Sequence, residues 1–329
     1  MRKYLRQKLL LRDDLLLKKD SECVYFPILS IPNELKSYSV TTSVFEEKER
    51  IPASYKNIAK VPETLRGCLP SSYDVIGDII LLKLPTPLLD YQKEIGNALL
   101  AVHPNIRTVC LVDAVAGELR TRKTTVIAGE RKTRTVHTEY GLSFNVDVQE
   151  TYFSPRLASE RWRVAHLVQP GETVIDMFAG VAPFSIMIAR YAKPSIVFAV
   201  DKNEEAVALA KENVLQNRVV DIVEVLSADA RDLEHLVPRK ADRIIMNLPF
   251  SAHQFFSSAL RLAAHRCIVH YYDIIKDEKL QERIEFLKNV GDELNFQLSD
   301  FSIRKMKSYA PREFYIGIDI TATKHADVA

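Results

Sequence analysis

The sequence of 329 residues lacks both a charge excess and long apolar runs. Its 45 Lys and Arg residues oppose 43 Asp and Glu residues, so the formal net charge is only +2. Any attraction to a nucleic acid must therefore come from a local patch. No apolar run approaches the ~20 residues that cross a bilayer. Charges interrupt the leucines of the N-terminal segment every few residues, which excludes a signal peptide.

Cysteine is scarce, and its spacing excludes two further classes. Cys23, Cys68, Cys110 and Cys267 are scattered without a CxxC pair, so we expect neither a zinc site nor a disulfide framework. No metal is predicted. Free cysteines are typical of a reducing compartment, and we expect the protein in the cytoplasm.

The first 150 residues predict two small domains joined by a linker. Residues 1–50 form a small N-terminal domain, with an amphipathic helix over the first 20 residues and a strand at 23–29. Residues 51–70 are charged and contain prolines, which predicts a linker. Residues 71–150 form a β-rich α+β middle domain. Its expected elements are a strand at 76–84, a helix at 88–102, a strand at 108–115, and hairpins broken at Gly129-Glu130 and Tyr140-Gly141.

From residue 151 to 329, segments typical of strands alternate with segments typical of helices. This rhythm predicts a mostly parallel sheet with helices on both faces. Ligands bind such sheets at the carboxyl ends of the strands. The expected strands include ETVIDMF, SIVFAVD, IVEVLSAD and ADRIIMN, with PFSIMIARYA and NEEAVALAKENVLQN among the helices.

The first strand of this region ends in a turn that favours a nucleoside over a dinucleotide. The turn runs from Asp176 through Phe178 and Ala179 to Gly180, and glycine allows a sharp bend and close approach of a ligand. The segment is not GxGxxG, because positions 182 and 183 are Ala and Pro. A pyrophosphate site is therefore disfavoured.

Acidic residues follow the next two strands. Asp201 ends the second strand, where a carboxylate accepts both hydroxyls of a ribose. Asp229 follows the third strand, where it can accept from an adenine amino group. Each residue taken singly is equally consistent with a helix cap or a turn. Together with the glycine turn, they predict S-adenosylmethionine as the cofactor.

A fourth strand leads into Asn247-Leu248-Pro249-Phe250. With the preceding motifs, this loop resembles the Asn-Pro loop of the class I methyltransferases, whose fold is Rossmann-like. The chain from about residue 71 resembles, more specifically, the archaeal and eukaryotic type of tRNA (guanine-N1) methyltransferases that act on position 37. The segments that support this resemblance are SYDVIGDIILLKLP (72–85), GELRTRK (117–123), YFSPRLASERWRVA (152–165) and DMFAGVAPFSI (176–186).

The resemblance implies a role for each residue of the site. Glu160 is the expected base for the N1 proton of guanine, and a raised pKa would suit that task. Arg120 would donate to O6 as negative charge develops there. Asn247, which we also expect near the cofactor, has a donor and an acceptor for the guanine edge. Pro249 would fix the loop, and Tyr152 or Phe250 would stack on the flipped base.

Structural roles compete with these assignments. Glu160 is equally suited to pair with Arg163 or Arg156 on a helix face, and Asn247 to form a turn. Arg120 belongs to a basic run and would then contact phosphate. For Tyr152, the competing interpretation is an aromatic residue packed in the hydrophobic core.

Basic residues predict an RNA-facing surface on tRNA, the expected partner. Such clusters contact phosphates without reading sequence. An unpaired or flipped guanine is required, because N1 lies on the Watson–Crick edge. The resemblance also implies that the N-terminal domain contacts the tRNA body. The predicted set is Arg122, Lys123, Arg131, Lys132, Arg134, Arg156 and Arg161, with Arg304, Lys305 and Lys307 as additions.

Four other functions stay open. A related enzyme transfers the aminocarboxypropyl group of S-adenosylmethionine in wybutosine synthesis, and Glu160 argues against it. A bifunctional relative also methylates carbon 7 of a wyosine intermediate. An N6-adenine methyltransferase is disfavoured by Leu248. A non-catalytic RNA-binding protein is disfavoured by the intact cofactor signature. We expect a monomer.

Overall fold

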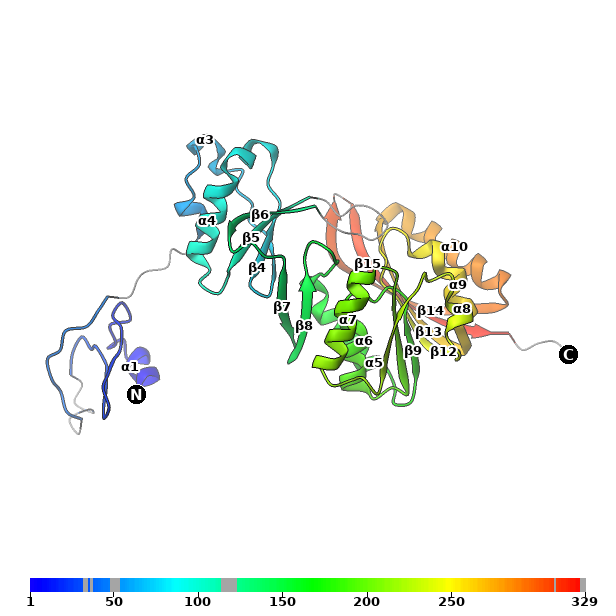
Figure 1. Cartoon of the computed structure of the whole chain (residues 1–329), viewed down its shortest axis with the longest axis horizontal. Helices are drawn as coiled ribbons and strands as arrows, with labels where there is room; N and C mark the ends of the chain where they lie inside the picture. Colours follow the sequence, from blue (N-terminus) through cyan, green and yellow to red (C-terminus); the bar gives the residue numbers. More distant parts are fainter. Residues whose placement is uncertain (32–34, 36–37, 48–53, 114–122, 311, 326–329) are drawn as a thin grey trace. The chain divides into compact units, whose positions relative to one another are not determined.

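The computed structural model describes residues 1–31, 35, 38–47, 54–113, 123–310 and 312–325 (Figure 1). It divides into two compact units, Met1–Ala59 and Lys60–Ala329. In this described part of the chain, no helix has the length and apolar character needed to cross a membrane.

The N-terminal unit consists of short elements. The helix expected over the first 20 residues is wrong beyond Gln7, because Leu9 takes a φ of 56° and the chain reverses there. Arg6 of the helix pairs with Asp13 of the returning segment, with 2.8 Å between Nη2 and Oδ1. The elements are α1 (Arg2–Gln7), β1 (Lys18–Lys19), β2 (Val24–Tyr25), which pairs antiparallel with β1, and α2 (Tyr55–Ile58).

A four-stranded sheet opens the second unit, in the order β3-β4-β5-β6. The single strand expected at 76–84 is a hairpin, because Gly77 turns the chain at a φ of 56°. A Cβ there would lie 2.1 Å from Thr135 Oγ1, so glycine is required. The elements are α3 (Glu63–Arg66), β3 (Asp74–Ile76), β4 (Ile79–Leu82), η2 (Thr86–Tyr91), α4 (Gln92–Val102), β5 (Thr108–Val112) and β6 (Thr124–Gly129).

Of the predicted hairpins, the one that turns at Tyr140-Gly141 pairs β7 (Arg134–Glu139) with β8 (Leu142–Asp147). The one expected at Gly129-Glu130 is wrong, because β6 pairs with β5 and β7 belongs to a separate sheet. The hairpin of β7 and β8 packs on helix α7 (Glu204–Gln216) of the next sheet. Asn213 Oδ1 on that helix accepts from the Asn145 backbone N–H at 2.6 Å, and Asn213 Nδ2 donates to the Asn145 carbonyl at 3.1 Å. The hairpin is thus anchored to the C-terminal part of the chain.

The C-terminal part contains a seven-stranded sheet in the order β11-β10-β9-β12-β13-β15-β14. Five strands are parallel and β15 is antiparallel to both of its neighbours, which confirms the predicted Rossmann-like fold. The strands are β9 (Thr173–Asp176), β10 (Ile196–Asp201), β11 (Val223–Ser227), β12 (Ala241–Met246), β13 (Ala263–Lys276), β14 (Phe296–Ala310) and β15 (Glu313–Lys324).

Helices cover both faces of this sheet, and side chains alternate between two cores (Figure 1). Along β9, Val174 packs with the core that includes α5 and α6, and Ile175 packs with the core that includes α9. This alternation is the two-residue period of a strand buried on both sides. The remaining elements are η3 (Pro155–Leu157), α5 (Ala158–Leu167), α6 (Pro183–Ala192), α8 (Leu233–Leu236), η4 (Ala252–Phe255), α9 (Phe256–Leu262), η5 (Asp277–Lys279) and α10 (Leu280–Glu293).

Candidate active site

A pocket of about 310 Å³ lies at the carboxyl ends of the parallel strands. Its walls come from the loops after β9, β10, β11 and β12 and from the segment 152–157. Strand order reverses between β9 and β12, because the chain passes from β9 outward to β11 before it returns. Ligands bind doubly wound sheets at this switch point.

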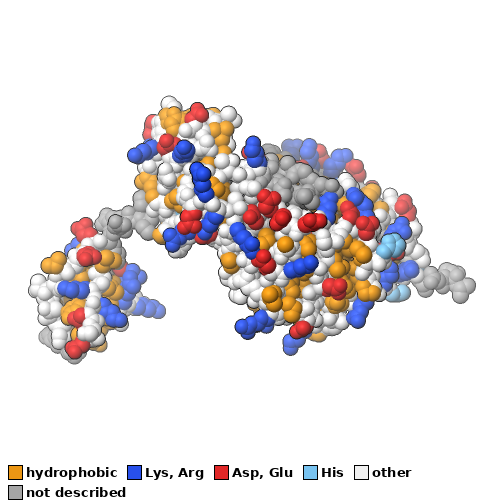
Figure 2. Space-filling model, viewed as in Figure 1, with side chains coloured by type: hydrophobic (Ala, Val, Ile, Leu, Met, Phe, Trp, Pro, Cys, Tyr) orange, Lys and Arg blue, Asp and Glu red, His pale blue; other side chains and the backbone are white. Residues whose placement is uncertain are grey.

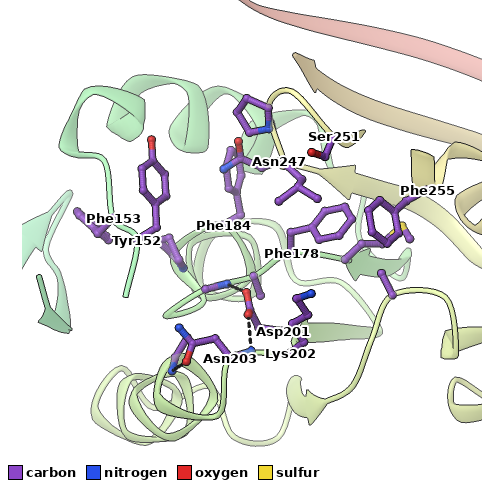
Figure 3. Close-up of a pocket in the computed structure, with 18 of the residues that line it drawn as sticks. Tyr152, Phe153, Phe178, Phe184, Asp201, Lys202, Asn203, Asn247, Ser251 and Phe255 are labelled. Carbon is purple, nitrogen blue, oxygen red and sulfur yellow. Dashed lines mark hydrogen bonds between the residues drawn. The ribbon is translucent and has the colours of Figure 1, made fainter. Parts of the chain in front are cut away.

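Asp201 forms the acidic end of the pocket (Figure 3). Its Oδ2 accepts from the Gly180 N–H at 2.7 Å, and its Oδ1 accepts from the Asn203 N–H at 2.9 Å. Burial raises the pKa of Asp201, and these backbone hydrogen bonds oppose the rise. A carboxylate offers about four lone-pair sites, more than its backbone hydrogen bonds use here, so the residue is suited to accept from a diol.

The glycine turn between β9 and α6 is shaped by backbone conformation. Gly180 and Ala182 both have positive φ values, 55° and 63°. A Cβ on Gly180 would have only the Tyr152 carbonyl oxygen within 4 Å, at 3.6 Å, so the φ rather than contact with protein atoms favours glycine there. Pro183 then starts α6, where its missing N–H costs nothing. Phe178, Ala179 and Gly180 line the pocket.

Asp176 lies below this turn and does not line the pocket. It is 1% exposed, and its Oδ2 accepts from Ser185 Oγ at 2.8 Å. Its Oδ1 is buried with no hydrogen-bond partner in the described part of the chain. Burial raises the pKa of Asp176 to about 7, with the Ser185 hydrogen bond opposing the rise.

Asp229 reaches the pocket from the loop after β11. Its Oδ1 accepts from the Arg231 N–H at 2.9 Å, and its Oδ2 accepts from Arg231 Nη1 at 3.2 Å. The Arg231 guanidinium carbon also lies 4.8 Å from the centre of the Phe255 ring, another wall of the pocket. Arg231 therefore fixes the orientation of the Asp229 carboxylate.

Asn247 lies at the other end, across Phe178 and Phe184 from Asp201 (Figure 3). Tyr315 Oη, from the antiparallel strand β15, donates to Asn247 Oδ1 at 2.5 Å. Pro249 and Tyr152 also line this end. The pocket thus joins an acidic end to an end with an amide and aromatic rings.

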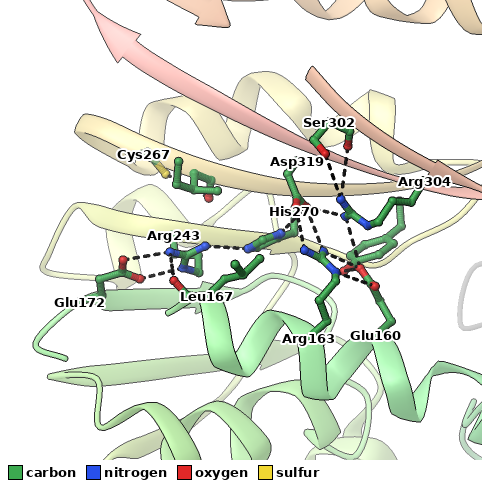
Figure 4. A network of polar contacts seen from close by, with 12 residues as sticks. Glu160, Arg163, Leu167, Glu172, Arg243, Cys267, His270, Ser302, Arg304 and Asp319 are labelled. Atoms are coloured by element: carbon green, nitrogen blue, oxygen red, sulfur yellow. Dashed lines mark hydrogen bonds and ion pairs between the residues drawn. The ribbon is translucent and has the colours of Figure 1, made fainter. Parts of the chain in front are cut away.

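Glu160 does not line the pocket, although Leu157 and Arg161 on either side of it do. It is 7% exposed and belongs to a polar network (Figure 4). Its Oε1 accepts from Tyr272 Oη at 2.8 Å and from Arg163 Nη2 at 2.7 Å. Arg304 Nη2 lies 3.5 Å from the same oxygen.

The expectation of a raised pKa for Glu160 is wrong. Burial favours a rise, but the hydrogen bond and charge of Arg163, with Tyr272 and Arg304, lower the pKa below its ordinary value. The competing interpretation, a pair with Arg163, is observed in buried rather than solvated surroundings.

The network continues through Asp319, which shares both arginines with Glu160. His270 Nδ1 lies 2.6 Å from Asp319 Oδ1, and Arg243 Nη1 lies 2.8 Å from His270 Nε2. Arg243 in turn pairs with Glu172 at 2.7 Å. Burial lowers the pKa of His270, which keeps the imidazole neutral. The network then contains three arginines and three carboxylates, so its charges balance.

The predicted basic residues differ in their surroundings. Arg120 and Arg122 lie outside the described residues. Lys123 and Arg131 are exposed, whereas Lys132 pairs with Asp78 at 2.6 Å. Arg134 pairs with Glu212, and Arg156 pairs with Asp74 at 2.6 Å.

The assignment of Arg161 to the RNA surface is corrected by its burial. The residue is 2% exposed, and its Nε donates to Glu139 at 2.9 Å. It also donates to the Ser154 carbonyl at 3.1 Å and lies over the Phe153 ring. Arg161 therefore shapes the pocket wall from inside.

Four residues of the site were not predicted from the sequence: Tyr315, Tyr272, Arg231 and Asp319. Tyr315 is separated from Asn247 by 68 residues, and only the insertion of β15 beside β13 brings the two together. Arg231 had a local signal, because it follows Asp229 by two residues at a strand end.

The strand order, the glycine turn and the acidic strand ends define a class I methyltransferase. The model for the "TRM5/TYW2 methyltransferase domain" matches residues 135–299, and that for the "TYW2 N-terminal domain" matches residues 55–133. The chain belongs to the TRM5/TYW2 family of S-adenosylmethionine-dependent methyltransferases.

Three relatives illustrate this family. The tRNA (guanine(37)-N(1))-methyltransferase Trm5b of Pyrococcus abyssi is 39% identical over 89% of this chain and 88% of its own. A structure described as the complex of aTrm5 and tRNALeu has a TM-score of 0.75 and 32% identity, covering 97% of this chain and 95% of that one. A tRNA(Phe) (4-demethylwyosine(37)-C(7)) aminocarboxypropyltransferase of Methanocaldococcus jannaschii is 32% identical over 75% of this chain and 96% of its own.

Proposed function

We propose that this chain transfers the methyl group of S-adenosylmethionine to N1 of guanosine 37 in tRNA. One observation carries the proposal: a single cavity joins the acidic end at Asp201 to the end formed by Asn247, Pro249 and Tyr152. The 39% identical relative that is named for this reaction supports it. S-adenosylmethionine supplies an electrophilic methyl group on a sulfonium.

The acidic end fits a nucleoside cofactor. Asp201 accepts from the ribose hydroxyls, and Asp229, fixed by Arg231, accepts from the adenine amino group. Asp176 lies beneath the glycine turn and does not line the pocket, so it acts on the cationic part of the cofactor through its charge and not through a contact. The chemistry of this donor set fits the cofactor without a phosphate site.

The other end fits a purine. Asn247 accepts from Tyr315 through Oδ1, so its amide N–H groups are free to donate to the guanine edge. Tyr152 and Pro249 hold the base flat, and aromatic stacking contributes about 1–3 kcal/mol per base. Arg120 keeps the role that the family resemblance gives it, donating to O6.

Glu160 is the proposed base for the N1 proton. Its lowered pKa keeps it ionised at neutral pH, as a proton acceptor must be. In the structure, Oε1 is occupied by Tyr272 and Arg163. We propose that tRNA binding loosens one of these contacts and brings the carboxylate to N1.

The exposed cations Lys123 and Arg131 are proposed to contact phosphates of the anticodon arm. The domain boundaries expected from the sequence stay a prediction, and we propose that the small N-terminal domain touches the tRNA body. We also propose that the enzyme acts as a monomer in the cytoplasm.

A second function is favoured by the match of residues 55–133 to the TYW2 N-terminal domain. In it, the same pocket would transfer the aminocarboxypropyl group to 4-demethylwyosine at position 37. Methylation of that base at carbon 7 is a third outcome on the same scaffold.

Two labels on S-adenosylmethionine separate these functions. The purified chain is incubated with unmodified tRNA, or with tRNA that contains 4-demethylwyosine, and with cofactor labelled either in the methyl group or in the carboxyl group. We expect methyl label in unmodified tRNA and no carboxyl label. Carboxyl label in the 4-demethylwyosine tRNA alone would establish the second function, and methyl label there would establish the bifunctional enzyme.

A further inference from the structure

Two exposed aromatic rings meet at the outer edge of the pocket. Phe250, which lines the pocket, is 46% exposed, and Tyr309 of β14 is 54% exposed. Their ring centres lie 5.4 Å apart at an angle of 76°. We call this pair the aromatic rim. Large exposed rings are costly in water, and two in contact beside a pocket indicate a binding surface.

The backbone of Phe250 is held in an uncommon conformation. Its φ is 74°, which few residues other than glycine adopt. Its N–H donates to Oδ1 of Asp273 at 3.2 Å, and Asp273 is 1% exposed. Asp273 Oδ2 accepts from Tyr271 Oη at 2.7 Å and lies 3.4 Å from Arg283 Nε. A buried carboxylate with several hydrogen bonds thus holds the backbone that carries the exposed Phe250 ring. Backbone strain, here a positive φ outside glycine, is frequent at functional sites.

Cations accompany the rim along β14 and its turn. Lys307 lies two residues before Tyr309, and Arg312 follows in the turn. Lys307 Nζ lies 5.4 Å from the centre of the Tyr315 ring, whose hydroxyl donates to Asn247. Figure 2 shows Lys and Arg side chains gathered along the upper edge of the molecule, where Figure 1 places the β14–β15 turn.

Aromatic faces beside cations are the usual means of binding unpaired nucleotides, because each ring stacks on a base and each cation neutralises a phosphate. The rim lies outside the end of the pocket that we assign to the target guanine. A base flipped into the pocket leaves its neighbour in the strand without a stacking partner. An aromatic ring at the pocket edge can replace that partner.

We propose that the aromatic rim is a second nucleobase site, in which Tyr309 stacks on the unpaired base next to the target nucleotide and Lys307 binds the phosphate between them. The site rests on the proposed function, since it takes the RNA strand that enters the same pocket. It contributes to RNA affinity and not to cofactor binding.

Substitution of Tyr309 gives the first test. In an anticodon stem-loop binding titration, Tyr309→Ala should weaken affinity by about tenfold or more, since a stacked base contributes ~1–3 kcal/mol. Tyr309→Phe, which keeps the ring, should bind within about twofold of the wild type, and so should Ile303→Ala, a control on the same strand that is 39% exposed. Affinity for S-adenosylmethionine should be unchanged in all three. Unchanged RNA affinity in Tyr309→Ala would overturn the proposal.

Abasic RNA gives the second test. Two stem-loops lack the base either just before or just after the target guanosine. The wild type should bind one of these two stem-loops about tenfold more weakly than intact RNA. Tyr309→Ala should bind that same stem-loop with the affinity that it has for intact RNA. Equal losses in both proteins would show that Tyr309 does not contact either base. These titrations need no catalysis, so failure of the wild type to methylate position 37 would refute the proposed function alone.

Discussion

At the scale of single residues, a buried acid beneath the glycine turn, Asp176, destabilises the fold. Burial raises the pKa of Asp176 to about 7, so the unfolded chain releases this proton at lower pH than the folded chain does. Stability therefore falls as pH rises from about 4 to 7, and the loss persists above pH 7. Oδ1 of Asp176 has no hydrogen-bond partner in the described part of the chain, and we propose that this cost is retained because the charge attracts a cationic ligand.

Asp176→Asn tests this interpretation. The substitution keeps an acceptor for Ser185 and removes the buried charge, so the melting temperature should rise by several degrees at pH 8 and change little at pH 4. Affinity for S-adenosylmethionine should fall by roughly several-fold in calorimetry, because the negative charge beneath the glycine turn no longer attracts the sulfonium. A lower melting temperature at pH 8, with cofactor affinity intact, would contradict both roles.

The proposed base makes a prediction at the same scale. Glu160→Gln should reduce single-turnover methyl transfer by about 10²–10⁴-fold, while leaving cofactor affinity nearly unchanged. Because neighbouring cations lower the pKa of Glu160 in the free protein, kcat/KM should persist as pH falls to the ordinary carboxyl range and be lost only below it. The rate within the complex should fall at a higher pH, because tRNA binding has then loosened one of these contacts.

Glu172→Gln is the matched control for that substitution. It removes a carboxylate that pairs with an arginine of the same network, Arg243, and its turnover should stay near the wild-type value. If Glu160→Gln keeps its turnover at every pH, Glu160 is not the base.

At the scale of elements, the antiparallel strand β15 completes the end of the pocket that we assign to guanine. Tyr315 near its start bonds Asn247, and Gly317 leaves room for the Tyr272 ring, whose Cε1 atom would lie 3.1 Å from a Cβ at that position. Tyr272 then reaches Glu160. Strand β15 therefore helps to position two of the three residues expected to act on the base, Asn247 directly and Glu160 through Tyr272.

Tyr315→Phe tests this role of the strand. The ring still packs, but Asn247 loses its hydroxyl partner, so kcat/KM for tRNA should fall by about tenfold with cofactor affinity within a few-fold. Tyr191→Phe removes an exposed hydroxyl that bonds the Tyr140 carbonyl, and steady-state kinetics should not change. Equal effects of the two variants would show that the Tyr315 hydroxyl has no special role.

Local signals predicted some elements well. Helix α6 spans Pro183–Ala192 as expected, because proline opens it and Lys193 ends it in a left-handed conformation. The prediction of the N-terminal helix was wrong beyond Gln7, because leucine spacing does not show that Leu9 takes a left-handed φ of 56° and reverses the chain.

Within the site, Asp201, Gly180 and Asn247 could be found because each lies at a strand end, where sequence position and sheet edge coincide. The Tyr315–Asn247 bond could not be predicted, since it depends on where β15 inserts in the sheet. The lowered pKa of Glu160 comes mainly from Arg163, a pairing on the same helix that the sequence did indicate. The smaller contributions of Tyr272 and Arg304 come from distant strands and could not be predicted.

At the scale of the whole molecule, net charge is almost balanced, so tRNA affinity must depend on a few cations. In a titration over salt concentration, Lys123→Gln and Arg131→Gln should each reduce the slope of log affinity against log salt by about one unit. Lys193→Gln changes an exposed cation at the end of α6 away from the pocket, and its slope should match the wild type. If the slopes of Lys123→Gln and Arg131→Gln equal that of Lys193→Gln, Lys123 and Arg131 do not belong to the RNA interface.

The central claim is that one cavity brings a methyl donor at Asp201 to a purine held at Asn247. The most direct measurement is mass spectrometry of nucleosides from tRNA after reaction of the purified chain with labelled S-adenosylmethionine. We predict label in 1-methylguanosine from position 37, and none in that product with Asp201→Ala or Asn247→Ala. Label on another nucleotide, or on another atom of the base at position 37, would contradict the account.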